Sequence, residues 1–312
     1  MTRPKHELKN SNFSNWQFIL MMSVAIVVWA FAFPFIKIGL SELSFVNLTI
    51  MRFFIVCIVL LTIILLQPKR FSKLQKKDII PIFLLGFFGV MVYHLGLNYS
   101  EQFISPGAAS LIVATSPIQI VILATIFLKE KLTLKKNLGI ILALSGVIII
   151  SLWGEKDVSL ELKYVSAALA VFIAAVMTAL YTVAGKRLLE RYSGLSLTTY
   201  AMLLGSIGLI PFLLPDFSIF GQALKMSLTA WFAVIFLGVF STVIGYVIWY
   251  VVLKAKTASE VSVYLYVVPV LSTIISYVLF KDEITLFFIL GGLLVIIGLV
   301  IVNMNKNKQK ID

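Results

Sequence analysis

FLKEKLTL, at residues 127–134, has a counterpart in LFKDEITL at residues 279–286, which keeps its first lysine and its final Thr-Leu. The two segments lie 152 residues apart. Without any gap, the same offset aligns identical residues at eight positions: Gly86 and Gly238, Phe88 and Phe240, Pro117 and Pro269, Lys129 and Lys281, Thr133 and Thr285, Leu134 and Leu286, Gly139 and Gly291, and Gly146 and Gly298. Matches of Leu or Ile arise easily by chance in an apolar chain, whereas proline, lysine, threonine and glycine matches at one offset do not. The sequence therefore predicts an internal duplication.

The composition places this chain in a membrane. Of its 312 residues 60% are apolar and 13% are charged, and the mean hydropathy is +1.03, which is outside the range of soluble domains. A helix needs about 20 apolar residues to cross a bilayer. Ten such stretches are predicted at residues 17–36, 45–66, 79–98, 106–128, 137–153, 164–185, 195–214, 228–253, 261–280 and 286–303.

Five spans fall in each copy of the duplication, and this odd number decides the topology. The second copy must enter the membrane from the opposite side, so we predict an all-α integral membrane protein of ten transmembrane helices arranged as two inverted five-helix repeats. The predicted parts are an N-terminal tail (1–16), a first repeat (17–153), an outer linker (154–163), a second repeat (164–303) and a C-terminal tail (304–312). Inverted repeats allow two conformations of similar energy around a shared midplane site, as alternating access requires.

The basic residues orient the chain. If the N-terminus is cytoplasmic, 20 of the 26 Lys and Arg residues lie in inner segments, five lie in outer segments, and Arg52 lies within a span. The positive-inside rule then predicts a multi-pass protein of the cell membrane with both termini in the cytoplasm. The net charge of +12 is explained by this topology and by anionic lipid, so we expect membrane lipid, and no nucleic acid, as a partner.

An ordered series of motifs resembles a known family. In chain order these are residues 29–37, Met51-Arg52-Phe53, residues 96–100, residues 106–109, Ser116-Pro117, residues 130–133 before Gly139 and Gly146, residues 179–182, Pro269, and residues 282–285. The order is similar to that of the EamA-type ten-helix transporters of the drug/metabolite transporter (DMT) superfamily. The sequence departs from the family pattern at Lys129, where glycine is usual, and at Asp282-Glu283, where the glutamate sits one place late.

The resemblance implies a function. It indicates a secondary transporter, or permease, that moves small metabolites through a central cavity lined by both repeats, with amino acids or related compounds exported across the membrane. A small-drug exporter and a membrane-embedded enzyme are the alternatives. The enzyme is disfavoured because two histidines and one cysteine, Cys57, with no carboxylate inside a predicted span, do not supply a clustered site. We therefore expect no enzyme activity, cofactor or metal. Both a monomer and a homodimer are compatible with the sequence.

Three polar residues within the predicted spans are candidates for the substrate path. Arg52 is the only formal charge well inside a span, where burial costs about 2.5–3.5 kcal/mol on insertion scales; it either binds a substrate carboxylate or gates, or else snorkels or joins helices. His94 matches Tyr246 at the 152-residue offset. It either binds substrate or protons, or it forms a hydrogen bond between helices. Gln119 follows Pro117, which frees a backbone carbonyl, so it either lines the path or joins helices.

Other candidates are aromatic or structural. Trp29, Tyr181 and Tyr246 are expected in the cavity because the resemblance places their helices around the central path. The predicted structural positions, for helix breaks or close packing, are Pro34, Pro117, Pro269, Gly139, Gly146, Gly291 and Gly298. Proton coupling would rest on His94 or on span-end carboxylates such as Glu130 or Glu260. Uncoupled exchange is the alternative.

Overall fold

The protein is a bundle of apolar helices. The structure, a computed structural model, describes residues 14–131, 133–153, 162–214, 218–280 and 285–303, and these contain no β-strand. Eight helical segments are long and apolar enough to cross a membrane. The apolar helices α7 (Leu134–Trp153) and α16 (Leu286–Asn303) add two more. The predicted all-α membrane fold is confirmed.

Some spans are single helices and others are built from consecutive pieces. The single helices are α1 (Asn15–Leu40), α2 (Phe45–Leu66) and α8 (Leu162–Leu188). The composite spans are α3 (Ile79–Gly86), η3 (Phe87–Val92) and α4 (Tyr93–Ser100); α5 (Pro106–Val113) and α6 (Ser116–Phe127); α9 (Gly194–Ser206), η4 (Ile207–Leu209) and α10 (Ile210–Leu213); α12 (Leu228–Ile235), η5 (Phe236–Ile244) and α13 (Gly245–Ala255); and α14 (Ala258–Ser262), η6 (Val263–Tyr266) and α15 (Val267–Phe280). Short connecting elements are η1 (Pro68–Arg70), η2 (Lys76–Asp78) and α11 (Ser218–Ala223).

A hydroxyl residue begins many of these spans. The side chains of Ser14, Ser44, Ser105, Ser193, Ser227 and Thr257 each accept a hydrogen bond from a backbone N–H in the first turn that follows. The first N–H groups of a helix have no partner within it, and a capping hydroxyl satisfies one of them. These caps therefore set where the chain turns back into the bundle.

The elements of the two halves correspond in register. α4 and α13 begin at Tyr93 and Gly245, α5 and α14 at Pro106 and Ala258, and α7 and α16 at Leu134 and Leu286, a separation of 152 residues in each case. A π-helical segment, η3 or η5, precedes α4 and α13. We propose on this basis that the halves are residues 17–153 and 164–303. The predicted tails and linker lie largely outside the described residues.

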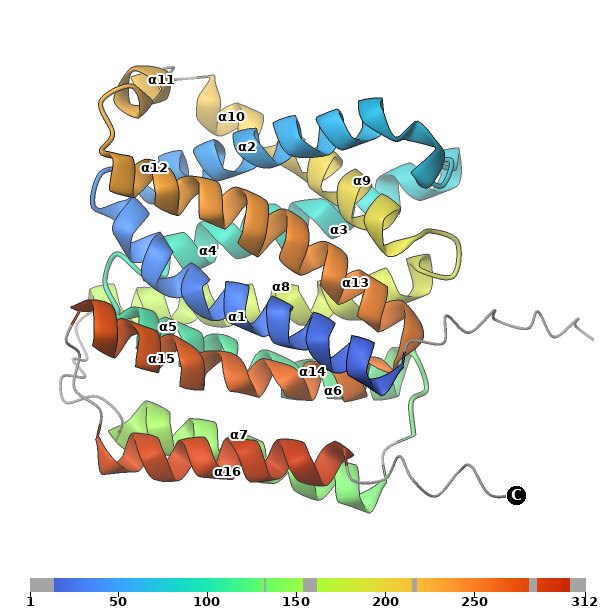
Figure 1. The fold of residues 1–312 in the computed structure, drawn as a ribbon, viewed down its shortest axis with the longest axis vertical. Coiled ribbons are helices and arrows are strands. Elements are labelled where there is room, and N and C mark those ends of the chain that lie inside the picture. The colour runs from blue at the N-terminus through green and yellow to red at the C-terminus, as the bar shows by residue number, and fades with distance from the viewer. Residues whose placement is uncertain (1–13, 132, 154–161, 215–217, 281–284, 304–312) are drawn as a thin grey trace, which may run out of the picture.

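The predicted glycines join α7 to α16, which lie side by side as a separate layer at the lower edge of Figure 1. A Cβ atom added to Gly146 would lie 2.4 Å from the carbonyl oxygen of Gly291, and one added to Gly298 would lie 2.5 Å from that of Gly139. The residue numbers rise on one helix as they fall on the other, so the two helices are antiparallel. Small residues permit this close backbone contact in lipid, where packing drives helix association.

The three prolines have different positions. Pro34 lies buried inside α1 without ending the helix. Pro117 lies in the first turn of α6, after a break from α5, and Pro269 lies inside α15 after the 3₁₀ segment η6. The spans containing Pro117 and Pro269 are thus both discontinuous, which frees backbone groups near the middle of the bundle.

The first described turn of α1 and the last of α16 lie on the same side of the bundle, at the right of Figure 1. The basic connections η1 and η2 lie on this side as well. We call it the basic side, and the side that carries the α1–α2 connection the opposite side. Helix α1 continues past the predicted end of its span to Leu40, with Lys37 exposed and its Nζ 4.9 Å from the ring centroid of Phe280.

We predict that Gly146→Ala destabilises the protein, because the new methyl group has no room against the backbone of α16. Overpacking of this kind costs about 1–3 kcal/mol, so the detergent-solubilised variant should unfold at a lower temperature than the parent. Gly221→Ala on α11 is the matched control, since no atom lies within 4 Å of its added Cβ. Equal melting temperatures for the two variants would contradict the packing proposed here.

Candidate transport site

A cavity of about 780 Å³, counted to its open mouth, lies between the two halves. Its lining residues come from α1, α2, η3, α4, α5 and α6 and from α8, η5, α13, η6 and α15. Five of the six predicted path residues line it: Trp29, Arg52, His94, Tyr181 and Tyr246. Gln119 does not. A mostly apolar pocket with a few convergent polar groups is the expected position of a ligand site.

Arg52 connects the two halves at the cavity wall. Its side chain is 2% exposed, its Nε donates to Thr242 Oγ1 at 2.7 Å, and its Nη2 donates to Ser241 Oγ at 3.1 Å. Thr242 Oγ1 in turn donates to the Leu237 carbonyl. Both partners are neutral, and no carboxylate among the described residues forms an ion pair with this guanidinium. The cavity therefore contains a positive charge that its hydrogen bonds do not neutralise.

The π-helical segment η5 supplies those partners. Besides Ser241 and Thr242, it presents the Ser241 carbonyl to Trp29, whose Nε1 donates to it at 3.0 Å. Segments of this kind widen the helix and occur frequently at functional sites. The two hydroxyl residues are functional candidates that the sequence reasoning missed. The available signal was a Ser-Thr pair inside an apolar span, in a chain that has one arginine within its predicted spans.

His94 is held in one orientation. Its Nδ1 lies 2.6 Å from the carbonyl oxygen of Val90, and because a carbonyl only accepts, the proton of the neutral ring resides on Nδ1. Its Nε2 is then an acceptor. The rings of Phe53, Tyr93 and Tyr246 lie 4.8–6.0 Å from the imidazole, centroid to centroid.

Aromatic rings form one continuous wall. Tyr246 contacts Trp29 at 5.9 Å and Tyr181 at 5.5 Å, both edge to face. Trp249 contacts Trp29 at 5.6 Å, and Tyr250 stacks on Tyr181 at 4.7 Å. Such pairs contribute about 0.5–1.5 kcal/mol beyond the area they bury, so the wall is rigid and well suited to an apolar or aromatic group of a solute.

The duplication explains why these residues meet. Trp29 and Tyr181 are 152 residues apart, and so are His94 and Tyr246. Equivalent residues of two repeats contact each other only close to the axis that relates them, and the rings of His94 and Tyr246 lie 6.0 Å apart. The cavity is thus built around this axis, where transporters of inverted-repeat design bind their solutes.

Gln119 lies on α6 outside the cavity lining. Its Nε2 donates to Thr115 Oγ1 at 3.2 Å, one turn earlier on the chain, and its Oε1 is buried without a hydrogen-bond partner. Its predicted place on the substrate path stays a prediction.

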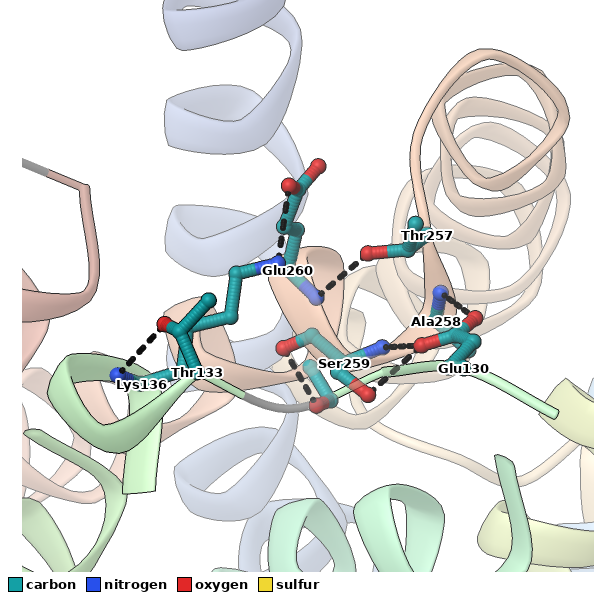
Figure 2. Close-up of polar contacts among 8 residues, drawn as sticks. Glu130, Thr133, Lys136, Thr257, Ala258, Ser259 and Glu260 are labelled. Carbon is teal, nitrogen blue, oxygen red and sulfur yellow. Dashed lines mark hydrogen bonds and ion pairs between the residues drawn. The ribbon is translucent and has the colours of Figure 1, made fainter. Parts of the chain in front are cut away.

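A network of polar contacts joins the halves at the basic side (Figure 2). Glu130 Oε1 accepts from the backbone N–H of Ala258 at 2.7 Å, while its Oε2 accepts from the N–H and hydroxyl of Ser259 at 3.0 and 2.6 Å. Beside it, Lys136 Nζ lies 3.1 Å from Glu260 Oε1. The connection after α6 is thereby fastened to the N-terminus of α14, so these contacts join the first half to the second. We call these contacts of Glu130 the Glu130 clasp.

Glu42, in the α1–α2 connection on the opposite side, accepts from the backbone N–H of Ser227 at 2.9 Å and from its hydroxyl at 2.5 Å. These two bonds hold the pKa of the Glu42 carboxyl below its ordinary value. Figure 1 shows α12, which Ser227 caps, above α1. The contact therefore joins the α1–α2 connection to the start of α12.

Comparison with known proteins identifies the family. The profile of the EamA-like transporter family matches the chain twice, over residues 16–152 and 165–304. The chain belongs to this family. It is thus an EamA-type transporter of the DMT superfamily, and a multi-pass membrane protein.

Relatives agree over nearly the full chain. An uncharacterized transporter of Archaeoglobus fulgidus is 38% identical over 91% of this chain and 97% of its own. The uncharacterized transporter YdfC of Bacillus subtilis is 33% identical over 94% and 93%. A protein of Streptantibioticus cattleyicolor named "Probable terminal-alkyne amino-acid exporter" is 32% identical over 92% of each chain. One solved crystal structure superposes with a TM-score of 0.70 over 93% of this EamA transporter and 97% of that chain; at 19% identity it shows the shared fold alone.

We predict that Glu130→Gln opens the cavity toward the basic side, because an amide nitrogen would face N–H and O–H donors that now bind a carboxylate. Hydrogen bonds to a charged group contribute about 1.5–3 kcal/mol, so the population open to this side should rise about tenfold or more. The measurement is labelling of a Thr182→Cys reporter in the cavity wall, in a Cys57→Ser background, by an impermeant maleimide applied from the basic side.

Glu190→Gln, an exposed glutamate of the same side, is the matched control and should label at the parent rate. Equal rates in the Glu130→Gln variant and this control would show that the Glu130 clasp does not hold the cavity shut.

Proposed function

We propose that this EamA transporter exports amino acids or closely related metabolites across the cell membrane by alternating access. The observation that carries the proposal is the Arg52 guanidinium, which is buried in the wall of an aromatic cavity and bonded only to neutral hydroxyls. A carrier without enzymatic chemistry fits the family and the names of the relatives.

The charge on Arg52 favours a solute with a carboxylate. Burying an ion without a countercharge is costly, and a guanidinium has five N–H donors, of which the two hydroxyls engage only Nε and Nη2. A carboxylate bound to the remaining donors would form charge-assisted hydrogen bonds of the strong class. The aromatic wall formed by Trp29, Tyr181 and Tyr246 would then pack against the side chain of the solute.

The distribution of charge and the names of the relatives support an orientation in the membrane and a direction of transport. The basic side, with its lysines and arginines in η1 and η2, is assigned to the cytoplasm by the positive-inside rule. The relative from Streptantibioticus cattleyicolor is named as an amino-acid exporter, which supports both the substrate class and outward flux. Opening of the Glu130 clasp would admit the solute from the cytoplasm in the first step of export.

A small-drug exporter is the second candidate, and the continuous aromatic wall favours it. Aromatic faces attract organic cations, whereas the Arg52 charge repels them. The two candidates therefore differ in the sign of the charge carried by the solute.

We predict that purified protein in proteoliposomes takes up labelled amino acids saturably and does not take up cationic dyes. Arg52→Gln keeps a polar side chain near Ser241 and Thr242 but removes the charge. Losing a charged hydrogen bond of about 1.5–3 kcal/mol should raise the KM for the amino acid about tenfold or more. Lys225→Gln, which removes an exposed positive charge, is the matched control. Uptake of dyes that is indifferent to Arg52 would instead establish the drug exporter.

A further inference from the structure

Glu101 is a buried carboxylate just beyond a membrane span. The residue follows the last turn of α4, on the opposite side, and its N–H bonds the carbonyl of Leu97 at 3.2 Å. Leu97 lines the cavity one turn earlier, about 6 Å along the helix axis. Glu101 therefore lies at the end of a helix whose preceding turns form the cavity wall.

Its environment does not provide what an ionised carboxylate needs. Glu101 is 4% exposed, and neither of its carboxylate oxygens has a hydrogen-bond partner. Most buried polar side-chain atoms are hydrogen-bonded, so each exception requires an explanation. An ionised carboxylate in such a site is much less stable than a neutral acid.

Several charged or ionisable groups face Glu101 from the elements around it. These are the positively charged Lys37 on α1 and Arg52 on α2, and the phenol of Tyr93 on α4 itself. Helix α8, which packs against α4, carries the exposed Lys163 in its first turn. Burial raises the pKa of the Glu101 carboxyl well above its ordinary value, although the positive charges of Lys37 and Arg52 act in the opposite direction. Burial therefore favours the neutral acid over the carboxylate at this position.

We propose that Glu101 is a proton-binding residue that couples transport through the cavity to the pH on the opposite side of the membrane. When this end of the cavity closes, the carboxylate takes up one proton from water and is buried as the neutral acid. When it opens, water reaches Glu101, the O–H bond breaks, and the proton returns to solvent while the carboxylate stays. The inference deepens the proposed export function and rests on it for the coupled flux.

The other candidate carboxylates are already engaged. Glu130 accepts three hydrogen bonds in the Glu130 clasp, and Glu260 pairs with Lys136. His94 keeps an acceptor at Nε2, because its Nδ1 proton is bound to the Val90 carbonyl, so His94→Gln is a separate arm of the test. Among the described carboxylates, Glu101 combines burial with two unpartnered oxygens.

The test requires no knowledge of the solute. Trp29 and Trp249 line the cavity, so quenching of their fluorescence by acrylamide reports its opening, in a background where Trp16, Trp153 and Trp231 are replaced by Phe. Between the ordinary pKa of an exposed glutamate and the raised pKa of buried Glu101, each further pH unit favours the open form by up to about tenfold, so quenching should increase as pH rises through this range. Glu101→Gln, a permanently neutral mimic, should abolish this increase, whereas Glu190→Gln should retain it.

A second arm tests coupling. In proteoliposomes, changing the pH of the compartment that Glu101 faces should change the flux of a labelled amino-acid mixture through the parent, and Glu101→Gln should lose that response while retaining pH-independent exchange. Glu101→Asp should restore both pH responses. A pH response of quenching that persists in Glu101→Gln, or one that His94→Gln abolishes instead, would overturn the proposal. Absence of amino-acid flux in the parent would refute the proposed function and leave the quenching result to decide the role of Glu101.

Discussion

The charge on Arg52 must be accommodated away from water, and much of the central architecture follows from that constraint. A guanidinium enclosed in a helical bundle needs hydrogen-bond acceptors, yet acceptors in an apolar span have to come from another helix. The hydroxyls of Ser241 and Thr242 provide them from η5 in the second half, and Trp29 binds the backbone of the same segment. These bonds join α1 and α2 to η5, so the two halves meet at a polar seam inside a largely apolar bundle.

The seam is also where the symmetry of the duplication is broken. The 152-residue offset places Trp29 and Tyr181 at equivalent positions of the two halves, and likewise His94 and Tyr246. At each of these positions the two halves carry a different side chain. Polar character in the first half comes from Arg52 and His94, and in the second half from hydroxyls. A binding site between two similar but unequal walls can orient a polar solute while the backbone retains two conformations of comparable energy. The packed glycines of α7 and α16 form a separate layer that stabilises the bundle without entering this seam.

Acidic residues distinguish the two ends of the molecule. On the basic side, Glu130 is saturated with donors from the N-terminus of α14, which is a favourable position for an anion. On the opposite side, Glu101 has no such donors. In the proposed mechanism, the Glu130 clasp holds the basic side shut, and burial of Glu101 favours closure of the opposite side only while its carboxyl is protonated. A carrier with these two ends would be sensitive to pH on one side alone.

The sequence by itself determined the helical membrane fold, because a chain this apolar must satisfy its backbone hydrogen bonds within helices, and it determined the duplication through proline, lysine and glycine matches at one offset. It also indicated Arg52, His94 and the aromatic residues, since buried polar groups in lipid are few and costly. It did not reveal Ser241, Thr242 or Glu101. Hydroxyl residues are common in membrane helices, and the position of Glu101 just after an apolar span is typical of an exposed loop residue. Only the tertiary structure decided that Glu101 is buried, because that burial comes from neighbouring segments far away along the chain. The same holds for Gln119, which lies in a span as expected but is not among the residues that line the cavity.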